Sequence, residues 1–107
     1  MRRGASHHIG NVDLAGRAEE LTQRALRLQR RGELRRASMS LREATALDES
    51  NAARWMLYAR SLARLGQRHE AERAMKQALF LRERSGEKAK ANVIRRLLLN
   101  LAGVADR

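Results

Sequence analysis

The sequence predicts an all-α protein, and three observations lead to that prediction. From about residue 14 onward, apolar residues recur at intervals of three and four almost to the end of the 107-residue chain, which is the spacing of one helix face. The chain contains no proline, so no ring blocks the continuation of a helix. Glycine or small polar residues interrupt the pattern at four places, namely Arg31–Gly32, Asp48–Asn51, Leu65–Gly66 and Ser85–Gly86.

These interruptions divide the chain into five expected helices, over about 14–31, 33–48, 52–65, 68–84 and 87–102. Gly32 and Gly66 stand where the end of a helix favours a left-handed residue. Ser50 or Asn51 can cap the third helix by accepting its free amide hydrogens. Glycines recur in the first residues without a sustained period, so residues 1–13 are expected to form a flexible arm, with Asp13 as the candidate N-cap.

The chain also repeats itself with an offset of 34 residues. Eight small or apolar positions pair at that offset, while the residues between them differ. The pairs are Leu21 with Trp55, Ala25 with Ala59, Leu28 with Leu62, Gly32 with Gly66, Ala37 with Ala71, Leu41 with Met75, Ala44 with Ala78 and Leu47 with Leu81. The alanines let two helices of a hairpin approach closely, so packing explains which positions are kept.

The paired positions resemble the 34-residue pattern of the tetratricopeptide repeat family. The resemblance covers about residues 18–85, with one repeat at about 18–51, a second at about 52–85, and a capping helix at about 87–102. It implies an α-solenoid of two helical hairpins within a single domain, 14–107. The chain departs from the family pattern at several positions: Glu49 and Glu83 replace the usual proline, Arg24 stands at position 7 of the first repeat, and position 24 lacks the usual aromatic residue.

The last helix differs from the repeats. Its best fit needs a connection one residue longer, which seats Ile94, Leu97 and Leu101 against the second repeat. Together with Val93 and Leu98, these residues span about 140° of the helix, which is wide for a helix that covers one neighbour. Leu99 falls on the far side, where it is either an ordinary exposed residue or one edge of a dimer or partner contact. Because two repeats and a cap are few for a stable solenoid, a homodimer through Leu98 and Leu99 is a candidate.

The chain is strongly basic, with 23 Lys and Arg against 12 Asp and Glu and a formal net charge of +11. Twenty of the basic residues are arginine, and alanine is also abundant. A GC-rich bacterial genome explains this bias as well as phosphate binding does. Whatever its origin, the charge attracts acidic partners over about a Debye length.

Several functional classes find no support in the sequence. The absence of cysteine excludes disulfides, thiolate zinc sites and a cysteine nucleophile. Acidic residues and histidines lack the spacing of a catalytic or metal site, and His7–His8 is a pair without a third ligand. No enzyme, cofactor or metal site is therefore expected. Since no apolar run approaches the roughly 18 residues that span a bilayer, the prediction is a cytoplasmic protein without membrane contact.

The resemblance implies that a partner binds on the concave side, which the first helix of each repeat lines. Projection of these helices predicts a mixed groove that binds an acidic or amphipathic protein segment, so the expected function is that of an interaction adaptor. Its apolar side chains accept a partner's apolar anchors, and its arginines donate to carboxylates. The candidate residues are Gln23, Leu26, Arg30, Met56, Leu57, Arg60 and Arg64.

The alternative is a nucleic-acid-binding helical repeat that contacts phosphates without sequence specificity. Arginine pairs such as Arg35–Arg36 and Arg95–Arg96 supply the charge. They lie on several faces, however, and no free aromatic residue interleaves them for base stacking. Trp55 and Tyr58 share a face with Ala59 and are expected to pack in the core. Protein binding is therefore the favoured prediction.

Overall fold

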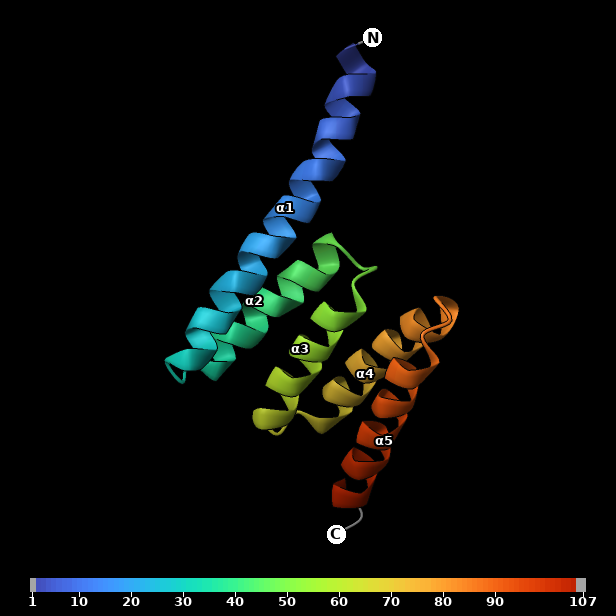
Figure 1. Ribbon diagram of the computed structural model, residues 1–107. Coiled ribbons are helices and arrows are strands. Elements are labelled where there is room, and N and C mark those ends of the chain that lie inside the picture. The colour runs from blue at the N-terminus through green and yellow to red at the C-terminus, as the bar shows by residue number, and fades with distance from the viewer. Residues whose placement is uncertain (1, 106–107) are drawn as a thin grey trace.

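The computed structural model describes the backbone of residues 2–105 and the side chains of residues 13–103. Five helices follow one another across the molecule in chain order, each roughly antiparallel to the one before (Figure 1). Over residues 2–105 there is no β-strand. The predicted all-α helical repeat with five helices is confirmed. The helices are α1 (Arg2–Arg30), α2 (Leu34–Leu47), α3 (Ala52–Arg64), α4 (Arg68–Arg84) and α5 (Lys88–Ala105).

The first helix differs from the expected boundary. The sequence predicts an arm over 1–13, whereas α1 begins at Arg2. Isolated glycines such as Gly4 and Gly10 lower helix propensity by about 1 kcal/mol each, but they do not block the backbone as proline does. The side chains of His7 and His8 lie outside the described residues. The other helix ends agree with the expected ones to within about three residues.

Glycine ends the helix before each of three tight turns. Gly32 and Gly66 both have φ +79°, and Gly86 has φ +74°, a left-handed conformation in which glycine has no Cβ to clash. After each glycine, the next amide donates to the carbonyl five residues earlier, as in Gln67 N to Leu62 O at 2.9 Å. These are Schellman turns, and they confirm the prediction for Gly32 and Gly66.

The connection from α2 to α3 is of a different kind. The side chain of Asn51 accepts a hydrogen bond from the Arg54 amide at 3.0 Å, so it caps α3 as predicted. A side-chain cap at the start of α3 therefore separates the first hairpin, α1/α2, from the second, α3/α4.

Alanine sets the spacing inside both hairpins. Ala25 and Ala59 are completely buried, as are their partners Ala37 and Ala71 on the following helix. The equivalent positions of the 34-residue repeat therefore occupy equivalent environments. The buried core cluster of the second hairpin also includes Ile94 of α5, which has no counterpart in the core of the first hairpin.

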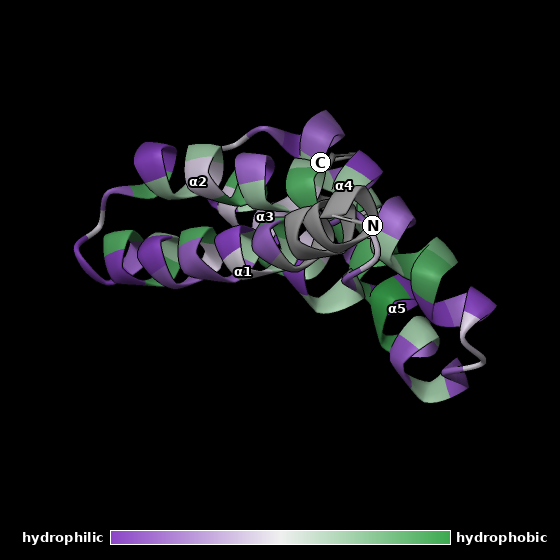
Figure 2. Ribbon diagram, turned by 90° about the horizontal axis from the view of Figure 1, so that it is seen from above, coloured by the Kyte–Doolittle hydropathy of each residue, from purple (hydrophilic) through white to green (hydrophobic). Residues whose placement is uncertain are grey.

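Helix α5 covers the second hairpin, and Figure 2 shows both hydrophobic (green) and hydrophilic (purple) residues along it. Ile94 is buried, and Leu97, Leu98 and Leu101 pack against the core of the second hairpin. This is the contact that the longer connection predicts. On the opposite side, Leu99 is 71 % exposed. Of the two leucines predicted at a homodimer contact, only Leu99 is freely accessible.

Candidate functional site

A groove of about 440 Å³ lies between α3 and α5. Each helix contributes four residues at the spacing i, i+3, i+4 and i+7, which places them on one face. Arg82 at the end of α4 completes the wall. The lining residues are Ala53, Met56, Leu57 and Arg60 from α3, Lys90, Val93, Ile94 and Leu97 from α5, and Arg82. We call this the α3/α5 groove.

The floor of the α3/α5 groove is apolar, and its rim is cationic. Met56 and Leu57 from α3 lie opposite the apolar residues of α5. Val93 is 53 % exposed although it is a large aliphatic residue, because the wide apolar face of α5 is only partly covered by α4. Apolar side chains that face water in a groove gain free energy when a partner covers them, about 25 cal/mol per Å².

Three cations stand around this floor, and one carboxylate binds two of them. Arg82 Nη1 donates to both oxygens of Glu87, at 3.1 and 3.2 Å. Lys90 Nζ lies 3.4 Å from Glu87 Oε1. The hydrogen bond from Arg82, together with Lys90, lowers the pKa of Glu87 below its ordinary value. Arg60 is exposed, and among the side chains of 13–103 no carboxylate lies within ion-pair distance of it.

The structure brings together three of the seven residues predicted to bind a partner. Met56, Leu57 and Arg60 line the α3/α5 groove, whereas Gln23, Leu26, Arg30 and Arg64 are not among its lining residues. On α1, the Gln23 amide donates to Glu19 of the same helix at 2.9 Å, and Leu26 is half-buried. Leu57 also packs against the core of the first hairpin.

Sequence projection misses the α5 wall of the groove. Lys90, Val93, Ile94 and Leu97 have the same spacing as the α3 residues that projection finds. Two features of the sequence carry this information: the spacing itself and the wide apolar face of the last helix. Neither feature predicts Arg82, because this residue reaches the groove from α4, the second helix of its repeat.

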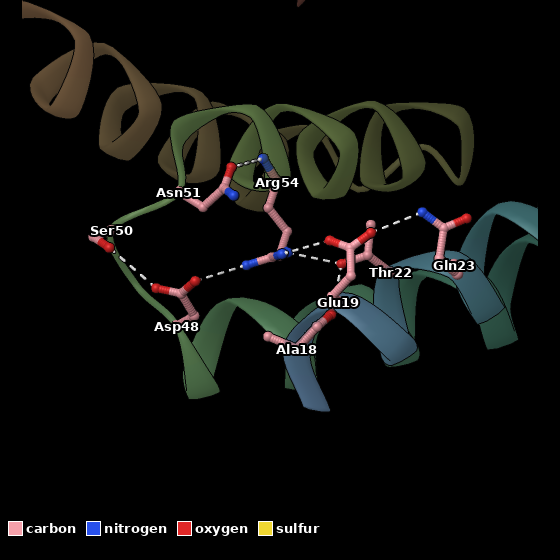
Figure 3. Close-up of polar contacts among 8 residues, drawn as sticks. All are labelled: Ala18, Glu19, Thr22, Gln23, Asp48, Ser50, Asn51 and Arg54. Atoms are coloured by element: carbon pink, nitrogen blue, oxygen red, sulfur yellow. Dashed lines mark hydrogen bonds and ion pairs between the residues drawn. The ribbon is translucent and has the colours of Figure 1, made fainter. Parts of the chain in front are cut away.

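A buried arginine joins α1 to α3 (Figure 3). Arg54 is only 5 % exposed, and its guanidinium has three hydrogen-bond acceptors. Nε donates to Thr22 Oγ1 at 2.7 Å, Nη1 to Asp48 Oδ2 at 3.0 Å, and Nη2 to Glu19 Oε1 at 3.2 Å. The acceptors come from α1 and from the α2–α3 connection, so one side chain links three segments. No pattern in the sequence identifies this contact.

The pKa values of the two carboxylates reflect this contact. A hydrogen bond from Gln23, with a further contribution from Arg54, lowers the pKa of Glu19. Burial by itself would raise the pKa of Asp48, but hydrogen bonds from Ser50 and Arg54 outweigh it and lower the pKa. A second polar link, from Gln29 Nε2 to Ser61 Oγ at 3.1 Å, joins the same two helices further along.

A second cleft, of about 390 Å³, lies between α2 and α4. Trp55 and Tyr58 of α3 line it, with ring centroids 6.3 Å apart. Both side chains are half-buried and pack against the core of the second hairpin, so they are partly core residues, as the sequence predicts, and partly exposed in the cleft. Burial, followed by the charge of Glu70, raises the pKa of Tyr58, and Arg42 and Arg73 oppose this effect.

No family model matches the chain, and no curated protein matches it. Within the part of the chain that the structure describes, no group of three or more His, Cys, Asp or Glu side chains is placed to hold a metal ion. None of the helices in that part is both long and apolar enough to cross a bilayer. The α3/α5 groove is the arrangement from which a function can be argued.

Proposed function

We propose that this protein is a tetratricopeptide-like adaptor that binds an acidic, amphipathic segment of another protein in the α3/α5 groove. The observation that carries the proposal is the pairing of an apolar floor with a cationic rim on two helices of the same spacing. An amphipathic helix places its own apolar residues at i, i+3, i+4 and i+7. Such a helix has the same spacing of apolar residues as each wall of the groove.

The charge of the rim selects among amphipathic segments. Arg60, Arg82 and Lys90 present three cations against the single carboxylate of Glu87, and the whole chain has a formal net charge of +11. Carboxylates on the partner complement this charge, and long-range attraction speeds their encounter with the groove. Binding of this kind needs no catalytic group. A cytoplasmic adaptor is the form that the sequence favours.

Calorimetric titration tests the proposal with a designed helical peptide of about 18 residues. The peptide has leucines at helical spacing and glutamates flanking them, and a dissociation constant on the order of 1–100 µM is expected. Met56→Asp places a charge on the apolar floor and should weaken binding at least about tenfold. Met39→Asp makes the same change at an exposed methionine on α2, outside the groove, and should change the affinity less than about twofold.

A second variant separates loss of binding from loss of folding. Arg60 is exposed on the rim, so Arg60→Glu should leave the melting temperature unchanged. It should weaken binding of the acidic peptide about tenfold. Equal effects of Met56→Asp and Met39→Asp would contradict the proposal. Micromolar binding of random duplex DNA at physiological salt, falling steeply with added salt, would instead support the nucleic-acid alternative.

The homodimer is a separate prediction. Leu99 is the exposed member of the predicted contact on α5. If this leucine joins two copies, light scattering of the purified protein should give twice the mass of 12.2 kDa, and Leu99→Lys should return it to the monomer mass. A monomer mass for the unchanged protein would end this prediction without affecting the groove.

A further inference from the structure

Glu87 occupies a defined position in the turn between α4 and α5. Its amide donates to Arg82 O at 2.9 Å, and its carbonyl accepts from the Ala91 amide at 2.9 Å. The backbone therefore fixes the residue between the end of one helix and the start of the next. From this position the carboxylate meets the Arg82 guanidinium and the Lys90 ammonium at the rim of the α3/α5 groove.

The other two Schellman turns show which part of this arrangement is structural. Glu33 and Gln67 hold the same turn position, and their amides make the same bond to the carbonyl five residues earlier, both at 2.9 Å. Because Gln67 serves in one turn, the turn does not need a carboxylate. Both glutamates pair with a basic residue three positions later, Glu33 with Arg36 and Glu87 with Lys90.

Only Glu87 adds a second cation, and that cation lines the groove. The side chain of Arg82 is 19 % exposed, so it is held largely out of water, whereas that of Arg36 is 58 % exposed. One nitrogen of Arg82 donates to both carboxylate oxygens, and Lys90 contacts one of them. The Glu87 carboxylate lies between two cations at the edge of the apolar floor. An acidic side chain of the proposed partner would contact the same cations through the same chemical group.

We infer that the carboxylate of Glu87 occupies the anion position of the α3/α5 groove and competes with a partner's carboxylate for Arg82 and Lys90. This inference rests on the proposed function. A partner must displace Glu87 to reach both cations, and Glu87 lowers the positive charge of the rim by one. Glu87 therefore sets how strongly the groove distinguishes acidic segments from neutral ones. It also limits the affinity of the groove for acidic segments.

Glu87→Gln tests the inference, because the amide keeps the shape of the side chain and removes its charge. Glu33→Gln is the matched control, since it makes the same change at the same turn position in the first hairpin, away from the groove. Two probes are titrated into each protein: the acidic amphipathic peptide and its counterpart with every glutamate replaced by glutamine. Melting temperatures of both variants confirm folding.

The expected result is selective. Glu87→Gln should increase the affinity for the acidic peptide about three- to tenfold and change the affinity for the neutral peptide less than about twofold. Glu33→Gln should leave both affinities unchanged. Equal tightening of the two peptides would overturn the inference, because the effect would then not be charge competition.

The failure of this inference is distinguishable from failure of the proposed function. If Met56→Asp abolishes peptide binding while Glu87→Gln behaves like Glu33→Gln, the groove binds partners and Glu87 does not compete with them. If neither peptide binds any of the proteins, the proposed function and this inference are both wrong. If Glu87→Gln weakens binding of the acidic peptide, Glu87 assists binding instead of competing, and the inference is wrong.

Discussion

The junction between α1 and α3 and the junction between α3 and α5 solve the same packing problem in opposite ways. At the first junction, Arg54 reaches from α3 to acceptors on α1 and on the α2–α3 connection. At the second, apolar side chains of the two helices face a groove of about 440 Å³. One junction is joined by the chain's own polar groups, and the other leaves a groove between the two helices.

The 34-residue repeat shows which substitutions produce the difference. Thr22, which accepts from Arg54, corresponds to Met56, and Gln29, which donates to Ser61, corresponds to Ala63. Both polar residues of α1 are therefore apolar on α3. With methionine in place of Thr22, the second junction lacks the hydroxyl that accepts from the Arg54 Nε at the first. Two stacked copies of one hairpin can thus differ in how they contact the next helix while their small packing residues stay the same.

The largest expected effect comes from Arg54→Met at the first junction. Methionine keeps an unbranched apolar stem but removes the hydrogen bonds from Arg54 to Thr22, Asp48 and Glu19, so the free energy of unfolding should fall by about 2–4 kcal/mol. Arg60→Met makes the same change on an exposed position of the same helix and should cost less than about 0.5 kcal/mol. Urea denaturation measures both. Equal losses in the two variants would show that the contacts of Arg54 contribute no more to stability than an exposed arginine does.

A smaller effect is expected when acid removes the carboxylates that bind Arg54. The folded-state pKa values of Glu19 and Asp48 lie below their ordinary values of 4.5 and 3.8. Each therefore contributes stability that is fully present above the ordinary value and is lost as the pH falls through the folded one. The stability difference between the unchanged protein and Arg54→Met should be largest above about pH 4.5 and should shrink below it.

Denaturation curves at several pH values check this prediction. A difference that stays constant between about pH 7 and about pH 2 would mean that Arg54 stabilises the junction through packing and not through charge. The second junction offers the complementary measurement. Arg60→Met should show the same pH dependence as the unchanged protein, because Arg60 forms no ion pair among the described side chains.

The smallest effects concern the turns, which are alike at both junctions. Gly32, Gly66 and Gly86 share a left-handed backbone, and a methyl group added at any of them would meet no atom within 4 Å beyond the adjoining residues, so alanine meets backbone strain but no clash. Each alanine variant should lose about 1 kcal/mol of stability, measured as a fall in melting temperature. Similar losses at all three would show that the turns do not cause the difference between the junctions. Only Gly86→Ala should also change peptide binding, because the turn at Gly86 positions Glu87 and Lys90 at the rim of the α3/α5 groove.

The repeated framework could be predicted from the sequence because it depends on local rules. Gly32 and Gly66 adopt the left-handed conformation that their positions require, Asn51 caps α3, and Ala25 and Ala59 are equally buried. Each of these outcomes follows from backbone geometry or from side-chain size within one hairpin. The early start of α1 was not predicted, since glycine is a weaker signal against helix than proline.

The site was predicted only in part because it depends on how separate elements meet. Projection around one helix finds Met56, Leu57 and Arg60 but cannot show which neighbouring helix faces them. Arg82 enters the groove from α4, and Arg54 is buried by contacts with residues 32 and 35 positions away. An arginine in a repeat reads as surface charge until its acceptors on other elements are known.

The methyl groups of methionine offer the most direct test of the α3/α5 groove as the binding site. Met56 lies in the groove, Met39 is 65 % exposed on α2, and Met75 is buried in the core. NMR spectra of protein with ¹³C-labelled methionine methyls, recorded during titration with the acidic amphipathic peptide, report on all three. We predict that the Met56 signal shifts in a saturable way while the Met39 signal stays in place. A shift at Met39 with Met56 unchanged would contradict binding in this groove.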